Sequence, residues 1–89
     1  MSEFDWSDEK NAWLESTRGI CFDDVLVCIE NGAVLDVIRH PNQTRYPGRN
    51  VIIVEMAGYV WLVPYTKSKG VRFLKTVIPS RKATKEYLT

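Results

Sequence analysis

The residues that could do chemistry are mostly basic and aromatic, and they lie in the second half of this 89-residue chain. Metal-free cleavage of RNA needs a base for the 2′-hydroxyl, cations at the phosphate oxygens and an acid at the 5′-oxygen. Arginine suits the phosphate because its planar guanidinium pairs with two oxygens at once, and aromatic rings hold unstacked bases. The residues of this set are His40, Arg45, Tyr46, Arg49, Tyr65, Arg72, Lys75, Arg81, Lys82 and Tyr87.

Several members of the set have a structural interpretation beside the chemical one. His40 stands between Arg39 and Pro41 and is expected in a loop, where it either transfers protons near neutral pH or is an ordinary exposed histidine. Glu55 is either a general base or a partner in a salt bridge at the end of a strand. Arg81 is expected at the start of a helix, where positive charge opposes the helix dipole, and this placement against local preference favours a functional role.

Signatures of other enzyme classes are absent from the sequence. It has no glycine-rich phosphate loop, GxSxG, HExxH or CxxC motif. Cys21 and Cys28 with a single histidine make a poor disulfide framework and a poor zinc site. Cys28 is expected to be structural, and nothing places either cysteine beside His40. We therefore expect no metal and no cofactor.

Charge divides the chain into two unlike parts. Residues 1–38 hold nine acidic and two basic residues, a net charge of −7, whereas residues 39–89 hold ten basic and two acidic residues, a net charge of +8. This split predicts two electrostatically distinct faces, of which the basic one suits a polyanion. The alternative is that folding pairs the two halves with each other.

Helical periodicity occurs in the first third of the chain and strand periodicity follows it. Ser7 can cap a helix that ends near Gly19, and a second helix is expected from Phe22 until Asn31-Gly32. Strands are expected over 33–38, 50–56, 59–65 and 71–78, and a short helix after Ser80. This order predicts one α+β domain over residues 1–89, with N-terminal helices packed on a four-stranded antiparallel sheet. No signal peptide or membrane span is visible, so a cytoplasmic protein is expected.

Both ends of the sequence resemble the BrnT family, toxins of type II toxin–antitoxin pairs. The first resemblance runs from Trp6 to Phe22, where Trp-Ser-Asp-Glu-Lys and later Arg-Gly-Ile-Cys-Phe are similar to the family's W-D-x-x-K and K-H-G-[IV]-x-F segments. The second is Val77-Ile-Pro-Ser-Arg-Lys-Ala-Thr84, which resembles the family's I-I-S-A-R-x-A-T ending. Departures from the family pattern occur at Leu14, Thr17, Arg18 and Pro79-Ser80.

Membership of that family would imply a RelE-like fold, RNA cleavage that halts translation, and neutralisation by a small antitoxin. The resemblance assigns Arg81, Lys10 and Arg49 to basic positions of the family, with Lys75 near a further one. We therefore predict a metal-independent endoribonuclease with RNA and a cognate antitoxin as partners. Its candidate catalytic residues are Arg49, Arg81, Lys75, His40, Glu55 and Tyr65, and its candidate RNA contacts are Arg45, Arg72, Lys82 and Lys10. The alternative is a non-catalytic module that binds RNA or protein on the same fold.

Overall fold

Two helices form the N-terminal part of the chain in the computed structural model, which describes residues 3–88. Helix α1 spans Asp8–Arg18; the Ser7 hydroxyl caps it by accepting a hydrogen bond from the Lys10 amide, and Gly19 ends it in the left-handed conformation. Helix α2 spans Phe22–Glu30, and Asp24 accepts a hydrogen bond from the Cys21 amide at its start. Both helices therefore begin and end close to where their capping residues predict.

Within residues 3–88 the strands form one mixed sheet of six strands rather than the four antiparallel strands expected from the sequence. Four strands lie in the order β5, β4, β3, β2, all antiparallel neighbours, and two short strands add to them. Their bounds are β1 Phe4–Asp5, β2 Val34–Arg39, β3 Asn50–Met56, β4 Tyr59–Ser68, β5 Val71–Leu74 and β6 Ile78–Pro79.

One of the two departures, the division of the expected strand over 71–78, follows from the length of β4. This strand has ten residues, so its distal half pairs with β5 while its first half pairs with β6 at Trp61 and Leu62. The expected strand over 71–78 is consequently two strands against one partner. Strand β1 then adds to the outer edge of β5 in parallel, with Phe4 opposite Arg72.

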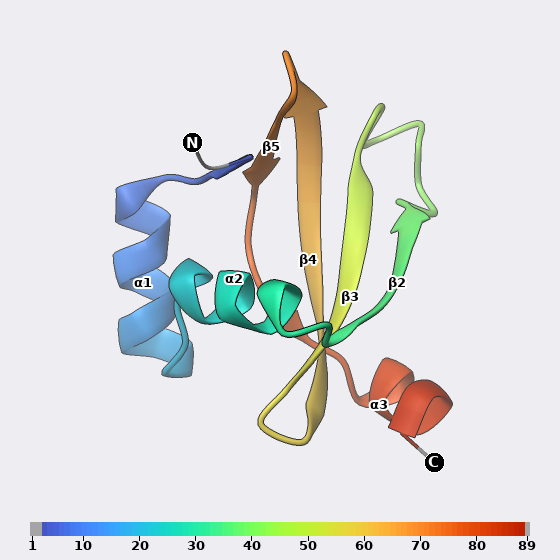
Figure 1. The fold of residues 1–89 in the computed structure, drawn as a ribbon. Helices are drawn as coiled ribbons and strands as arrows, with labels where there is room; N and C mark the ends of the chain where they lie inside the picture. Colours follow the sequence, from blue (N-terminus) through green and yellow to red (C-terminus); the bar gives the residue numbers. More distant parts are fainter. Residues whose placement is uncertain (1–2, 89) are drawn as a thin grey trace.

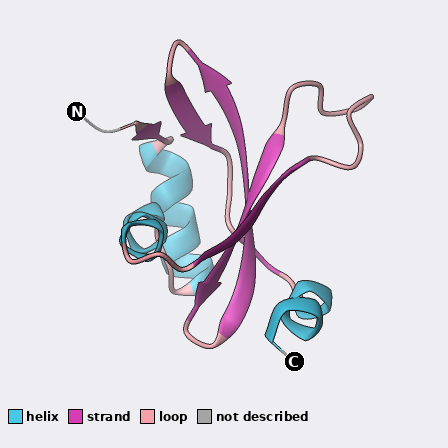
Figure 2. Ribbon diagram, turned by 45° about the vertical axis from the view of Figure 1, so that its right-hand side comes forward, coloured by secondary structure: helices cyan, strands magenta, loops and turns pink. Residues whose placement is uncertain are grey.

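Helices cover both faces of the sheet, so the core has two layers (Figure 1). Alternation along β3 sends Ile52, Val54 and Met56 toward α1 and α2, where they pack with Leu14 and Phe22. Val51 and Ile53 alternate with these residues and face the other side of the sheet. There they pack with Val60 of β4 and with Ala83 of helix α3, which spans Arg81–Leu88. Figure 2 shows α3 on the opposite side of the twisted sheet from the other two helices. Central strands that are apolar on both faces follow from this arrangement.

The two ends of the central hairpin present different features. At one end lies the long loop between β2 and β3, and at the other lies the tight turn from β3 to β4 (Figure 1). The turn residues Ala57 and Gly58 both have positive φ, 55° and 75°. Among the described residues, no helix is long and apolar enough to cross a membrane.

Candidate functional site

The loop from His40 to Arg49 is held in shape by its own hydrogen bonds. The His40 amide donates to the Arg49 carbonyl oxygen at 2.9 Å, which closes the two ends of the loop. Inside it, the Gln43 side-chain amide donates to the carbonyl oxygens of His40 and Arg49 at 2.8 and 3.0 Å and accepts from the Gly48 amide at 3.1 Å. The result is an ordered loop whose ends lie close together, a form typical of functional surface loops.

Tyr46 is the centre of a group of side chains in this loop, which we call the loop cluster: His40, Arg45, Tyr46 and Arg49. The Tyr46 ring lies 4.6 Å from the His40 ring between centroids. The guanidinium carbons of Arg49 and Arg45 lie 4.9 and 5.5 Å from the Tyr46 ring centroid. Two permanent cations and one titratable ring thus surround a single aromatic side chain, so phosphate contact and base stacking can occur at one place.

Two atoms of the loop cluster restrict its chemistry. The Nε of Arg49 is buried and has no hydrogen-bond partner, although an N–H donor in that position normally has one. His40 accepts a hydrogen bond from the Asn42 amide at Nδ1, at 3.0 Å. The neutral ring therefore carries its proton on Nε2, and its only lone pair is already used. In this state His40 can donate a hydrogen bond to a phosphate, whereas it must break the Asn42 bond to accept a proton.

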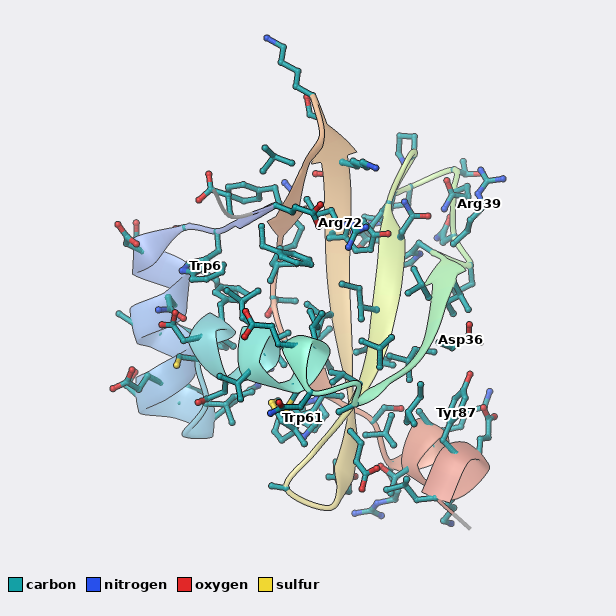
Figure 3. The ribbon with its side chains drawn as sticks, in the orientation of Figure 1. Trp6, Asp36, Arg39, Trp61, Arg72 and Tyr87 are labelled. Carbon is teal, nitrogen blue, oxygen red and sulfur yellow. The ribbon has the colours of Figure 1, made fainter. Side chains whose placement is uncertain are left out.

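Other predicted site residues approach the same end of the sheet. Tyr65 is the register partner of Asn50, next to Arg49, but it is only 8% exposed and belongs to the core. Arg72 shares a sheet face with Tyr65, the face that α1 and α2 cover, and its guanidinium carbon lies 5.2 Å from the Phe4 ring centroid. The Lys75 ammonium lies 4.7 Å from the Phe73 ring centroid. Figure 3 shows Arg39 beside the loop and Arg72 in front of β4. Cations thus line this end over β2, β3 and β5.

Glu55, Arg81 and Lys82 lie at the opposite end of the sheet. Glu55 pairs with Val60 in register, and the Val60 carbonyl accepts a hydrogen bond from the amide of Ser80, the residue before Arg81. Val60 is five residues along β4 from Tyr65, or about 17 Å of extended chain. The structure therefore does not bring Arg49 and Arg81 to one phosphate, and Glu55 is separated from the loop cluster.

Lys10 lies on helix α1, away from both ends of the sheet described above. Its ammonium lies 4.1 Å from the ring centroid of Trp13, and the Arg18 guanidinium lies 5.1 Å from the same ring. Arg18 also donates a hydrogen bond of 2.7 Å to the Val77 carbonyl oxygen, which ties α1 to the chain before β6. Arg18 therefore has a structural role. Helix α1, which carries Lys10, lies across the molecule from the β2–β3 loop (Figure 1).

The two thiols have environments that oppose nucleophilic chemistry. Burial raises the pKa of Cys28 and of Cys21 above the usual thiol value, with Asp24 adding to the shift at Cys28. The thiolate is the nucleophile, so a raised pKa leaves both groups protonated at neutral pH. Both are free cysteines in the helical segment, as expected of structural residues.

Within residues 3–88 no group of three or more His, Cys, Asp or Glu side chains could hold a metal ion. Comparisons with protein-family models, with curated proteins and with solved structures find no match. The sequence identified the basic and aromatic members of the loop cluster by type. It did not reveal Gln43, whose importance depends on the loop closing so that one amide reaches three backbone groups.

Proposed function

We propose that this chain is a RelE-like endoribonuclease toxin of the BrnT type, with the loop cluster as part of its RNA-contacting surface. One observation carries the proposal: Arg45, Arg49 and His40 converge on the Tyr46 ring in the ordered loop between β2 and β3. The antiparallel arrangement of β2 to β5 between N-terminal helices and a C-terminal helix is consistent with a RelE-like fold.

In the proposed reaction the 2′-hydroxyl gives its proton to solvent water and its oxygen forms a bond to the adjacent phosphorus. The bond from phosphorus to the 5′-oxygen breaks, and the 5′-oxygen takes a proton from solvent water. The products carry a 2′,3′-cyclic phosphate and a 5′-hydroxyl. Arg49 and Arg45 would neutralise the phosphate oxygens, and the free Nε2–H of His40 would donate a hydrogen bond to the same group. Tyr46 would stack on a base next to the scissile bond. Arg81 and Glu55 lie at the other end of β3 and would act on a different part of the RNA.

The second candidate is a non-catalytic RNA-binding module, and three specific observations support it. The lone pair of His40 is used by the Asn42 amide, Tyr65 is buried in the core, and Glu55 is remote from the loop. The residues expected to transfer protons are therefore not gathered around one phosphate. Binding needs only the cations and the ring, which the loop does gather.

A cleavage assay in EDTA separates the two candidates. Total RNA would be incubated with the wild-type protein and with Arg49→Ala, Arg81→Ala and Lys67→Ala variants, and the product ends would be analysed. We expect cyclic phosphate ends from wild type, loss of cleavage in Arg49→Ala and near wild-type cleavage in Lys67→Ala, which removes an exposed charge of the same half. Intact RNA with salt-sensitive binding would favour the binding module. Cleavage that survives Arg49→Ala but not Arg81→Ala would move the site to α3.

A further inference from the structure

Helix α2 presents an acidic and apolar stripe to the outside. Its exposed side chains include Asp23, Val27 and Glu30, which are four and three residues apart and so lie on one face. Val27 is 55% exposed although it is a valine in the middle of a helix. None of the nine residues of α2 is basic, and Glu30 lies in the last turn, where the helix dipole disfavours an acid.

An apolar pocket of about 350 Å³ opens beside this stripe. Its walls come from α2 and from the β3–β4 hairpin, and they include Asp24, Val27, Cys28, Met56, Ala57 and Trp61. The Trp61 indole is fixed in place because its Nε1–H donates to the Met56 carbonyl oxygen at 3.0 Å. Figure 3 shows Trp61 directly below α2, at the opposite end of the sheet from Arg39.

The turn that forms one wall of the pocket contains an unusual residue for its conformation. Ala57 has φ of 55°, in the left-handed region that favours glycine, asparagine or aspartate in two-residue hairpin turns. Alanine at this position costs stability relative to asparagine but leaves the wall apolar and short. A residue placed against its local preference beside a pocket points to a use for that pocket.

We infer that α2 and the pocket form a docking surface for a basic amphipathic helix of a protein partner. The partner would place an aliphatic or aromatic side chain in the pocket and Lys or Arg residues one turn to either side, against Asp23 and Glu30. The stripe spans eight residues, from Asp23 to Glu30, or about 10 Å, which matches two turns of helix. The charge of α2 repels nucleic acid and anionic lipid, so a basic protein segment is the complementary occupant.

This surface lies about 20 Å along β3 from the loop cluster, which is the length of six extended residues. The partner and an RNA would therefore bind at the same time rather than compete. The inference does not depend on the proposed nuclease function, because docking is tested without RNA.

A displayed library of helical 16-residue peptides would be selected on the immobilised protein and counter-selected on the Val27→Glu variant. We expect recovered peptides to carry one apolar anchor with Lys or Arg three or four residues to each side. Binding of a recovered peptide, measured by fluorescence anisotropy, should weaken at least about tenfold in Val27→Glu. Val37→Glu is the matched control because Val37 is 52% exposed and lies on β2, and it should leave the affinity unchanged.

Three outcomes would overturn the inference. The first is a selection that yields no peptide whose binding depends on Val27. The second is recovery of peptides that lack basic residues, since the charges of Asp23 and Glu30 would then play no part. The third is self-association of the protein alone in sedimentation experiments that Val27→Glu abolishes, because a second copy of the chain would then be the occupant.

Discussion

At the scale of single residues, Tyr46 matters because three charged or titratable side chains lie against its ring. Its contacts with His40, Arg45 and Arg49 hold them at one end of the sheet. The sequence indicated these residue types within one loop, since proline and glycine mark its limits. It could not indicate that Arg49 and Arg81 lie apart, because their separation depends on the register of β3 against β4.

Substituting Tyr46 by leucine keeps apolar bulk and removes the aromatic face. Stacking of a base on an aromatic ring contributes about 1–3 kcal/mol, so affinity for a single-stranded RNA should fall by roughly tenfold or more. Fluorescence anisotropy with a labelled oligonucleotide measures the change. Tyr59→Leu, which removes a ring beside Trp61 at the other end of the hairpin, is the control and should bind as wild type. Equal loss in both variants would contradict a role for the loop.

The raised pKa values of Cys28 and Tyr87 predict how the free energy of unfolding changes at alkaline pH. Burial raises the pKa of Cys28, and burial together with Asp36, which accepts a hydrogen bond from the Tyr87 hydroxyl at 3.3 Å, raises the pKa of Tyr87. The folded state therefore holds these protons more tightly than the unfolded state. The free energy of unfolding should be highest below about pH 8.5 and fall as the pH rises through the range where both groups titrate. Urea unfolding of a Cys28→Ala, Tyr87→Phe variant should show a shallower decline; an unchanged slope would rule out this origin.

At the scale of elements, local signals predicted the helices better than the strands. Ser7, Gly19 and Ser80 mark helix ends through capping, which depends only on neighbouring residues. Strand β1 and the division of residues 71–79 into β5 and β6 depend on which strand lies alongside, and no local pattern encodes that. The mixed sheet therefore differs from the antiparallel one that the sequence predicted.

The Ala57 turn gives a direct test of the conformational cost described above. Ala57→Asn places the preferred residue of a two-residue hairpin turn at a position with φ of 55°. We expect the free energy of unfolding to rise by about 0.5–1 kcal/mol, since the left-handed conformation disfavours alanine. Thermal unfolding followed by circular dichroism measures it. Ala12→Asn, on an exposed part of α1, should instead destabilise the protein because asparagine is a poorer helix former.

The Thr84 hydroxyl bonds helix α3 to strand β4. Thr84 Oγ1 donates to the Ser80 carbonyl oxygen at 2.7 Å and accepts from the Val60 amide at 2.9 Å. Thr84→Val keeps the shape and leaves the Val60 donor without this partner, so it should cost about 1–3 kcal/mol of stability. Chemical unfolding measures the loss, and Thr17→Val on exposed α1 is the control. A loss of unfolding free energy in Thr84→Val alone would support this role of the Thr84 hydroxyl. Small and equal losses in both variants would contradict it.

At the scale of the whole molecule, the basic loop cluster and the acidic helix α2 lie in different places. Among the described contacts, Arg45, Arg49, Arg72 and Lys75 lie on aromatic rings. Helix α2, which carries exposed acids, lies away from the β2–β3 loop (Figure 1). The proposed RNA contact and the inferred docking of a basic protein segment therefore use separate parts of the molecule.

The salt dependence of RNA affinity tests which surface contacts the phosphates. Each phosphate neutralised on a single strand contributes a slope of about −0.7 to the plot of log affinity against log salt concentration. A variant with both Arg45→Ala and Arg49→Ala should therefore lose about 1.4 from the magnitude of the wild-type slope. Lys10→Ala, which removes a charge on α1 across the molecule, should leave the slope unchanged. If Lys10→Ala lowers the slope and the double variant does not, RNA lies along α1 and the loop cluster is not its contact.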